Sequence, residues 1–150
     1  MKKILIIFLL IFSKNICAKE TLTIYTYDSF VSEWGPGPIV KEKFEKDFNT
    51  ELEFVAVDSA ATLLNKIILE GSSTKADIIL GLDMNLFDAA NRSNLFSNHK
   101  VGNINKQTQL PIKWDSDKFV PYNYGYFAFV YNNKNLKKPP LSMNELINST

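Results

Sequence analysis

The residues with the most evident chemistry are aromatic rings in residues 25–38, YTYDSFVSEWGPGP. Tyr25 fits a strand, whereas Tyr27 and Trp34 are expected outside it, next to a Gly-Pro-Gly-Pro turn. The face of a tyrosine or tryptophan ring attracts a cation by about 0.5 to 2 kcal/mol and stacks on other flat rings. We therefore expect Tyr25 to close a core, and Tyr27 and Trp34 to contact a flat or cationic ligand.

A second candidate site is the Asp-Ser-Ala-Ala turn at residues 58–61, where a helix is expected to begin. The first N–H groups of a helix have no partner within it and carry a partial positive charge, so they can bind a phosphate or carboxylate. Ser59 and Ala60 would supply these groups. The same residues also fit a plain helix cap made by Asp58 or Ser59. Spacing alone does not decide between the two roles.

Three aspartates could suggest a metal site. Asp77 fits the start of a strand, and Asp88 fits the polar face of a helix. Asp83 follows a predicted strand directly, so it could bind a ligand or cap the next helix. With one histidine, His99, and one cysteine, Cys17, the sequence argues against a zinc site, and no cofactor is expected.

The sequence lacks the motifs of the common enzyme classes. It contains no Gly-x-Ser-x-Gly elbow, no P-loop and no Gly-x-Gly-x-x-Gly fingerprint. His99 lies in a polar segment with no nucleophile or carboxylate motif beside it, so we expect a surface histidine. A binding protein is therefore favoured over an enzyme.

Residues 1–18 have the pattern of a secretory signal peptide. A basic start precedes an apolar run at residues 4–12, and the small residue Ala18 suits cleavage. Nine apolar residues are too few for a membrane span, which needs about 20. Cys17 would also fit a lipid-anchor signal, but the polar residues 14–15 do not. We expect export to the periplasm.

Removal of this leader lowers the formal charge from +1 to −2, because the leader carries three lysines. No basic stripe remains that would attract phosphate backbones, so nucleic acid is not expected as a partner. Cys17 leaves with the leader, and the exported chain then has no disulfide. The composition, 45% hydrophobic and 22% charged, is that of an ordinary globular domain.

Strands and helices alternate from Thr21 onward. Residues 21–27, 51–57 and 76–82 are rich in β-branched and aromatic residues and are expected to form strands. Two amphipathic helices fall between them, and another is expected near residues 84–91. This alternation predicts an α/β fold with a parallel sheet and right-handed crossovers.

Local signals set the bounds of the two amphipathic helices. The first helix is expected to have Pro38 in its first turn and to end near Asn49. The second is expected to be capped by Asp58 or Ser59 and to end at Gly71. Their predicted buried faces consist of residues spaced by three or four, which are Val40, Phe44 and Phe48 in the first helix and Leu63, Leu64, Ile67 and Ile68 in the second.

Ligands of open α/β sheets gather beyond the carboxyl ends of the strands. Residues 27–37, 58–61 and 81–85 are expected there. Farther along, residues 125–131 alternate like a well-buried strand, and Ser142 begins a capping box that opens a helix.

Four blocks of the sequence closely resemble the periplasmic thiamine-binding proteins, the solute receptors of bacterial thiamine ABC transporters. The blocks are YTYDSF, WGPGP, ADIILGLDMNL and FVPYNYGYFAFVYN, and the resemblance covers residues 21–150. It implies a type II periplasmic binding protein fold, in which two α/β lobes close on thiamine, thiamine monophosphate or thiamine diphosphate. It also implies an inner-membrane ABC permease as the partner.

The resemblance also implies roles for individual residues. Tyr27 and Trp34 would wall the ligand, and the backbone at Ser59 and Ala60 would meet its phosphate end. The sequence departs there from the acidic-Gly pattern of the family, and an alanine crowds the phosphate more than a glycine would.

The expected division of the chain is a signal peptide at residues 1–18, a first lobe with a crossover strand at residues 19–131, and the start of an incomplete second lobe at residues 132–150. The alternatives are a receptor of the same fold for ferric iron or a polyamine, and an enzyme on a two-lobed binding-protein fold.

Overall fold

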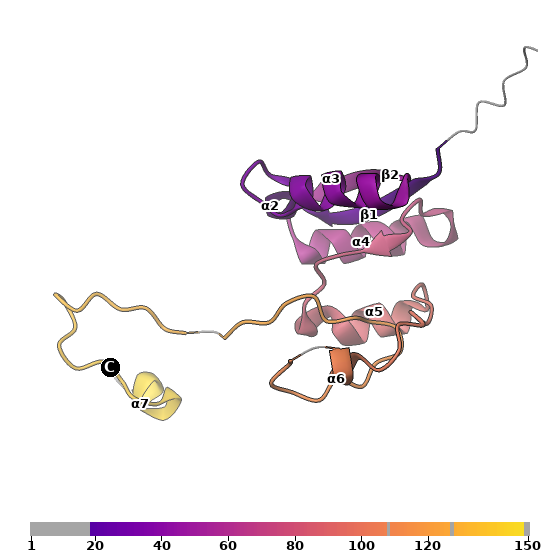
Figure 1. Ribbon diagram of the computed structural model, residues 1–150. Coiled ribbons are helices and arrows are strands. Elements are labelled where there is room, and N and C mark those ends of the chain that lie inside the picture. The colour runs from indigo at the N-terminus through magenta and orange to yellow at the C-terminus, as the bar shows by residue number, and fades with distance from the viewer. Residues whose placement is uncertain (1–18, 108, 127, 149–150) are drawn as a thin grey trace, which may run out of the picture.

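The computed structural model describes residues 19–107, 109–126 and 128–148 (Figure 1). The expected signal peptide lies outside the described residues. Within the described part of the chain, no helix is long and apolar enough to cross a membrane.

The centre of the fold is a three-stranded parallel sheet. Its strands are β1 (Thr21–Tyr27), β2 (Glu51–Val57) and β3 (Ile78–Ile79), in the order β2-β1-β3. β1 pairs with β2 over its whole length and with β3 over two residues. The predicted α/β class with a parallel sheet is confirmed, although the third strand is much shorter than the apolar run at residues 76–82 suggested.

Helices and 3-10 turns connect and follow these strands. They are α2 (Asp28–Val31), α3 (Gly37–Phe48), α4 (Ala60–Glu70), η1 (Gly71–Ser73), η2 (Met84–Leu86), α5 (Phe87–Ser93), α6 (Ile104–Gln107) and α7 (Met143–Asn148). Figure 1 shows the sheet with α3 and α4, then α5 and α6, and finally an extended segment that leads away to α7.

The predicted ends of the two long helices are confirmed. α3 has a proline in its first turn and ends at Asn49, which adopts the left-handed conformation with φ 52°. α4 begins after Ser59, whose side chain accepts a hydrogen bond from the N–H of Thr62, and it ends at Gly71 with φ 54°. Local residue chemistry is therefore enough to set these bounds.

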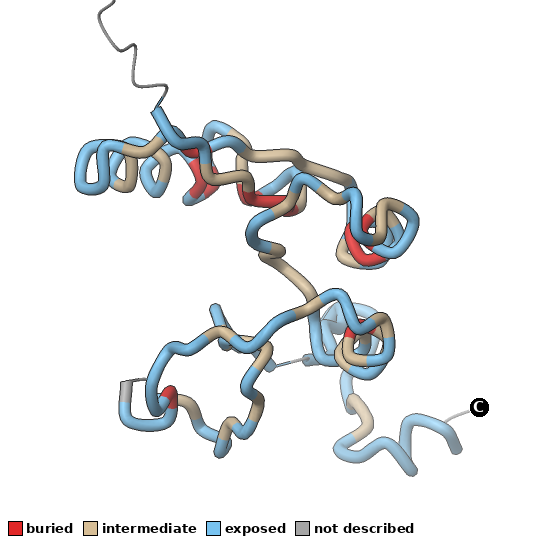
Figure 2. The backbone as a smooth tube through the Cα atoms, turned by 90° about the vertical axis from the view of Figure 1, so that its right-hand side faces the viewer, coloured by how far each residue is buried: buried red, intermediate tan, exposed pale blue. Residues whose placement is uncertain are grey.

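The core lies between β1 and α4. Tyr25 is 5% exposed and packs with Leu63 and Ile67, which are also buried. Figure 2 shows buried residues in the strands and on one side of α4, which packs against them. The expectation that Tyr25 closes a core is confirmed.

Three predicted buried positions are wrong. Val40 and Phe48 on α3 are 42% and 66% exposed, and Ile68 on α4 is 46% exposed. Helical spacing places these residues on the apolar stripe of each helix, but the sheet covers only part of each stripe because it has three strands and the last contains two residues.

The expected buried strand at residues 125–131 is also wrong. Phe127 lies outside the described residues, so this result concerns the other residues of the segment. None of the described residues is in a strand, and Tyr126, Phe129 and Val130 are 83%, 75% and 97% exposed. A strand forms only where its N–H and C=O groups pair with a neighbour. Alternation shows that a segment suits a strand, but it does not supply that neighbour.

The helix start predicted at Ser142 is confirmed, although the Glu145 side chain accepts the N–H of Leu141, whereas a capping box requires that of Ser142. The N–H of Glu145 donates to the Ser142 hydroxyl over 3.1 Å, and the N–H of Leu141 donates to the Glu145 carboxylate over 2.8 Å. Together these bonds satisfy donors at the start of α7.

Glu45 joins α3 to β2, one of the two outer strands of the sheet. Its carboxylate accepts a hydrogen bond of 2.9 Å from the N–H of Leu52, a residue that is 1% exposed. This bond, and to a smaller extent the nearby charge of Lys41, holds the pKa of Glu45 below its ordinary value. The carboxylate therefore favours the folded state at neutral pH.

We expect Glu45→Gln to remove part of the acid sensitivity of folding. A carboxyl group whose pKa is lower in the folded state stabilises the fold above its unfolded pKa, near 4.3, and this contribution is lost as the pH falls through the folded value. Urea unfolding should therefore show a lower midpoint for the variant at pH 7 and a smaller difference from the parent at pH 3. Glu42→Gln, on the exposed side of the same helix, is the control. A pH-independent difference for Glu45→Gln would contradict this assignment.

Candidate ligand-binding site

The carboxyl ends of the three parallel strands share one edge of the sheet. Tyr27 ends the central strand and lies opposite Val57 on β2. Ser59 follows on the β2 side of Tyr27, and Gly81 follows on the β3 side. The topology therefore brings the three predicted ligand segments to this edge.

Tyr27 is the last residue of β1, which confirms the strand expected at residues 21–27 and corrects the expectation that Tyr27 lies outside it. Its ring is partly buried against the backbone of Gly81, where an added Cβ would lie 2.3 Å from the ring. Gly81 also has φ 110°, so both the close approach of the Tyr27 ring and the backbone conformation require a glycine at residue 81. Burial, and secondarily the neighbouring Tyr122, raises the pKa of Tyr27. Its hydroxyl is therefore a neutral hydrogen-bonding group at physiological pH.

Phe30 holds the aromatic loop in place. It is 2% exposed, and its ring meets the rings of Tyr27, Phe54 and Tyr122 edge to face, with centroids 6.0, 5.7 and 5.9 Å away. The turn that follows is tight, because an added Cβ at Gly35 would lie 2.5 Å from the carbonyl oxygen of Phe30. The loop is thus a packed structure around one buried ring.

Trp34 is 80% exposed in the turn between α2 and α3. Among the described residues, no ring contact joins it to Tyr27 and no hydrogen bond holds its side chain. It does not belong to the core, as expected. The structure places Trp34 near the entrance to α3 without fixing its ring, so its role in ligand contact stays a prediction.

Ser59 and Ala60 lie at the start of α4. The Ser59 hydroxyl accepts the Thr62 N–H over 3.2 Å and shares a hydrogen bond of 2.9 Å with the Thr62 hydroxyl. Ser59 therefore caps the helix. The N–H of Ala60 precedes the hydrogen bonds within the helix, so it remains suited to an anion.

Two aspartates have structural partners. Asp83 caps η2, since its carboxylate accepts the N–H groups of Asn85 and Leu86 over 2.9 and 3.3 Å. The carboxylate of Asp77 accepts the N–H of Thr23 over 2.8 Å at the start of β3, as its sequence position predicted. Within the described ranges, no three histidine, cysteine or acidic residues are grouped closely enough to hold a metal ion.

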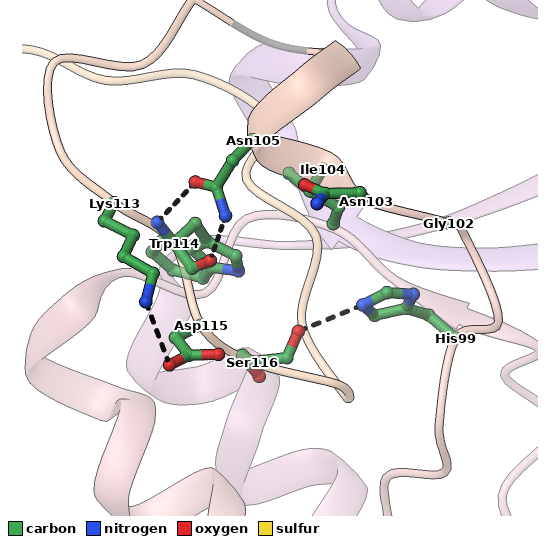
Figure 3. Close-up of a pocket in the computed structure, with 9 residues that line it drawn as sticks. All are labelled: His99, Gly102, Asn103, Ile104, Asn105, Lys113, Trp114, Asp115 and Ser116. Atoms are coloured by element: carbon green, nitrogen blue, oxygen red, sulfur yellow. Dashed lines mark hydrogen bonds and ion pairs between the residues drawn. The ribbon is translucent and has the colours of Figure 1, made fainter.

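The structure also contains a pocket of about 300 Å³ that the sequence did not predict (Figure 3). It lies away from the strand ends and is lined by His99, Gly102, Asn103, Ile104, Asn105, Lys113, Trp114, Asp115 and Ser116.

Hydrogen bonds within this pocket satisfy its main polar groups. The Asn105 amide donates to the Trp114 carbonyl over 2.6 Å and accepts the Trp114 N–H over 2.7 Å. His99 accepts the Val101 N–H at Nδ1, so Nε2 carries the proton and donates to the Ser116 carbonyl over 3.1 Å. His99 is therefore a partly buried link between two loops. The surface position that the sequence predicts for His99 is thus only partly correct.

The residue that sequence reasoning missed at the strand edge is Tyr122. It belongs to the block FVPYNYGYFAFVYN, but its ring contact with Phe30 joins segments far apart in the chain. The sequence shows several tyrosines in this block, but it does not indicate which of their rings packs against Phe30.

The chain is similar to known solute-binding proteins. The family model described as bacterial extracellular solute-binding protein matches residues 73–150. The thiamine-binding periplasmic protein of Escherichia coli (strain K12) is 50% identical over 141 residues, which cover 94% of this chain and 42% of that protein. The protein of the same name from Brucella suis biovar 1 is 54% identical over 130 residues, covering 87% and 38%.

A solved periplasmic thiamin binding protein has the same fold. It matches with a TM-score of 0.75 at 50% identity, over 87% of this chain and 41% of that chain. The resemblance drawn from the four sequence blocks is thus confirmed, as is the periplasmic binding protein fold. The chain spans about 40% of the length of these relatives. The chain belongs to the bacterial extracellular solute-binding protein family.

Proposed function

We propose that this chain is the ligand-binding first part of a periplasmic receptor that captures thiamine and delivers it to an inner-membrane ABC permease. The observation that carries the proposal is the aromatic ring of Tyr27 at the carboxyl end of β1. The chain is also 50% identical over 141 residues to a protein named for thiamine binding. The same relatives, named as periplasmic binding proteins, support a periplasmic location and a role without catalysis.

The chemistry of this edge suits thiamine, which combines a flat aminopyrimidine with a cationic thiazolium ring. Tyr27 and Trp34 supply aromatic faces for stacking and for the cation. The segments that follow the three strands contain no lysine or arginine in residues 28–36, 58–61 and 80–86, and their charged residues are Asp28, Glu33, Asp58 and Asp83. This negative charge favours a cationic ligand.

We further propose that the backbone at Ser59 and Ala60 meets the phosphate end of thiamine monophosphate or diphosphate. The support is the position of these residues at the amino end of α4 and the implied role in the family. Asp83 is a weaker candidate, because its carboxylate already caps η2.

A receptor for ferric iron or a polyamine is the second candidate, favoured by the tyrosines at the edge. Ferric iron bound to tyrosinates gives a visible charge-transfer band, whereas thiamine gives none and should quench tryptophan fluorescence. An absorbance and fluorescence titration of the full-length protein with both ligands therefore tests the proposed function. A visible band with iron and no response to thiamine would overturn it.

We expect Trp34→Ala to weaken thiamine binding by about 1 to 3 kcal/mol in the full-length protein, because an exposed ring that serves the ligand contributes little to the core. The melting temperature of the ligand-free form should change little. Calorimetry measures both quantities.

Trp114→Ala provides the control. The Trp114 indole donates to the Phe119 carbonyl over 2.8 Å and its ring contacts Phe87, so this change should lower the melting temperature with little effect on affinity. If Trp34→Ala instead lowered stability and left affinity unchanged, Trp34 would be a structural residue.

We expect Ala60→Pro to weaken binding of the phosphorylated forms more than binding of thiamine, because proline removes one backbone donor. Proline suits the first position of a helix, and Ser59 before it is already extended with ψ 159°. Ser59→Ala should remove the cap but barely change selectivity. Equal losses of affinity for all three ligands after Ala60→Pro would show that the turn is only a cap.

We expect residues 19–150 alone to bind thiamine no tighter than about 1 mM and to self-associate. These residues would supply one wall of a site between two lobes, and one wall leaves much of the ligand in water. Bound ligands of this size are usually about 70 to 90% buried. Exposed Tyr126, Phe129 and Val130 favour association. Calorimetry and light scattering test both statements, and micromolar binding by a monodisperse monomer would contradict them.

A further inference from the structure

Tyr122 shares a packing partner with Tyr27. Its ring stands edge-on to Phe30 with centroids 5.9 Å apart and an interplanar angle of 71°. The Tyr27 ring meets the same phenylalanine at 6.0 Å and 69°. One buried ring therefore holds two tyrosines in similar geometry, one at the end of β1 and one on the segment that returns to the sheet.

The two tyrosines also lie close enough to affect each other. The presence of Tyr122 raises the pKa of Tyr27, in addition to the larger effect of burial. Tyr122 itself is 53% exposed despite its contact with Phe30. A ring fixed on one side and open on the other is available to a ligand.

We propose that Tyr122 is a further ligand-contacting residue that forms, together with Tyr27, a two-ring wall for a flat cationic heteroaromatic ligand. The inference rests on the proposed function, since it adds a residue to the thiamine site. The sequence around Tyr122 does not indicate this role, and Tyr122 does not lie in a helix or a strand.

Packing makes this pair better prepared for binding than Trp34. Phe30 is 2% exposed and restrains both tyrosines before the ligand arrives, so little side-chain freedom is lost on binding. Trp34, at 80% exposure and without a ring contact among the described residues, must be ordered by the ligand. The two hydroxyls can additionally donate to or accept from polar groups at the rim of a flat ligand.

The test compares two tyrosines of the same segment in the full-length protein. Tyr122→Leu should weaken thiamine binding about tenfold, the order expected for the loss of one stacking or cation–π ring. Tyr126→Leu is the matched control, because Tyr126 is 83% exposed and its ring contact is to Tyr124, 6.1 Å away. Its affinity should stay within about twofold of the parent.

A second measurement uses the unmodified full-length protein and does not depend on folding of a variant. Thiamine at saturating concentration should protect Tyr122 from nitration by tetranitromethane and leave the nitration of Tyr126 unchanged, as read by peptide mass spectrometry. Parent-like affinity of a folded Tyr122→Leu variant, or equal nitration of Tyr122 with and without thiamine, would overturn the inference and leave the proposed function intact. Failure of the parent protein to bind thiamine would overturn both.

Discussion

The pairing of β1 with a parallel neighbour on each side is the constraint on which the site depends. Because β2 and β3 both run in the direction of β1, the segments after all three strands emerge at one edge. The pairing also fixes the face of each β1 residue. Tyr25 consequently meets α4 in the core, and Tyr27, two residues later on the same face, reaches the edge beside Gly81.

The signals that predicted the fold correctly are local ones. Asn49 and Gly71 end helices because they accept positive φ, and Ser59 begins one because its hydroxyl can accept a nearby N–H. Each of these properties is carried by one residue and its immediate neighbours. The parallel sheet followed from strands and helices that alternate along the chain.

Predictions failed where the outcome depended on a distant segment. Residues 125–131 have a strand pattern, but no described residue of this segment pairs in a sheet. Phe48 lies on the apolar stripe of its helix, but the narrow sheet leaves it exposed. The contact between Tyr122 and Phe30 likewise depends on the path of a long return segment. Residue type identified the aromatic loop, whereas only the fold shows which other ring joins it.

The bond between Glu45 and Leu52 has a consequence beyond the stability of α3. β2 is one of the two outer strands of the sheet within the described part of the chain, and an unpaired strand edge can act as a template for another chain. The Glu45 carboxylate already occupies the Leu52 N–H, and it adds a negative charge where an incoming backbone would approach. One side chain thereby occupies a donor that a strand added at this edge would need.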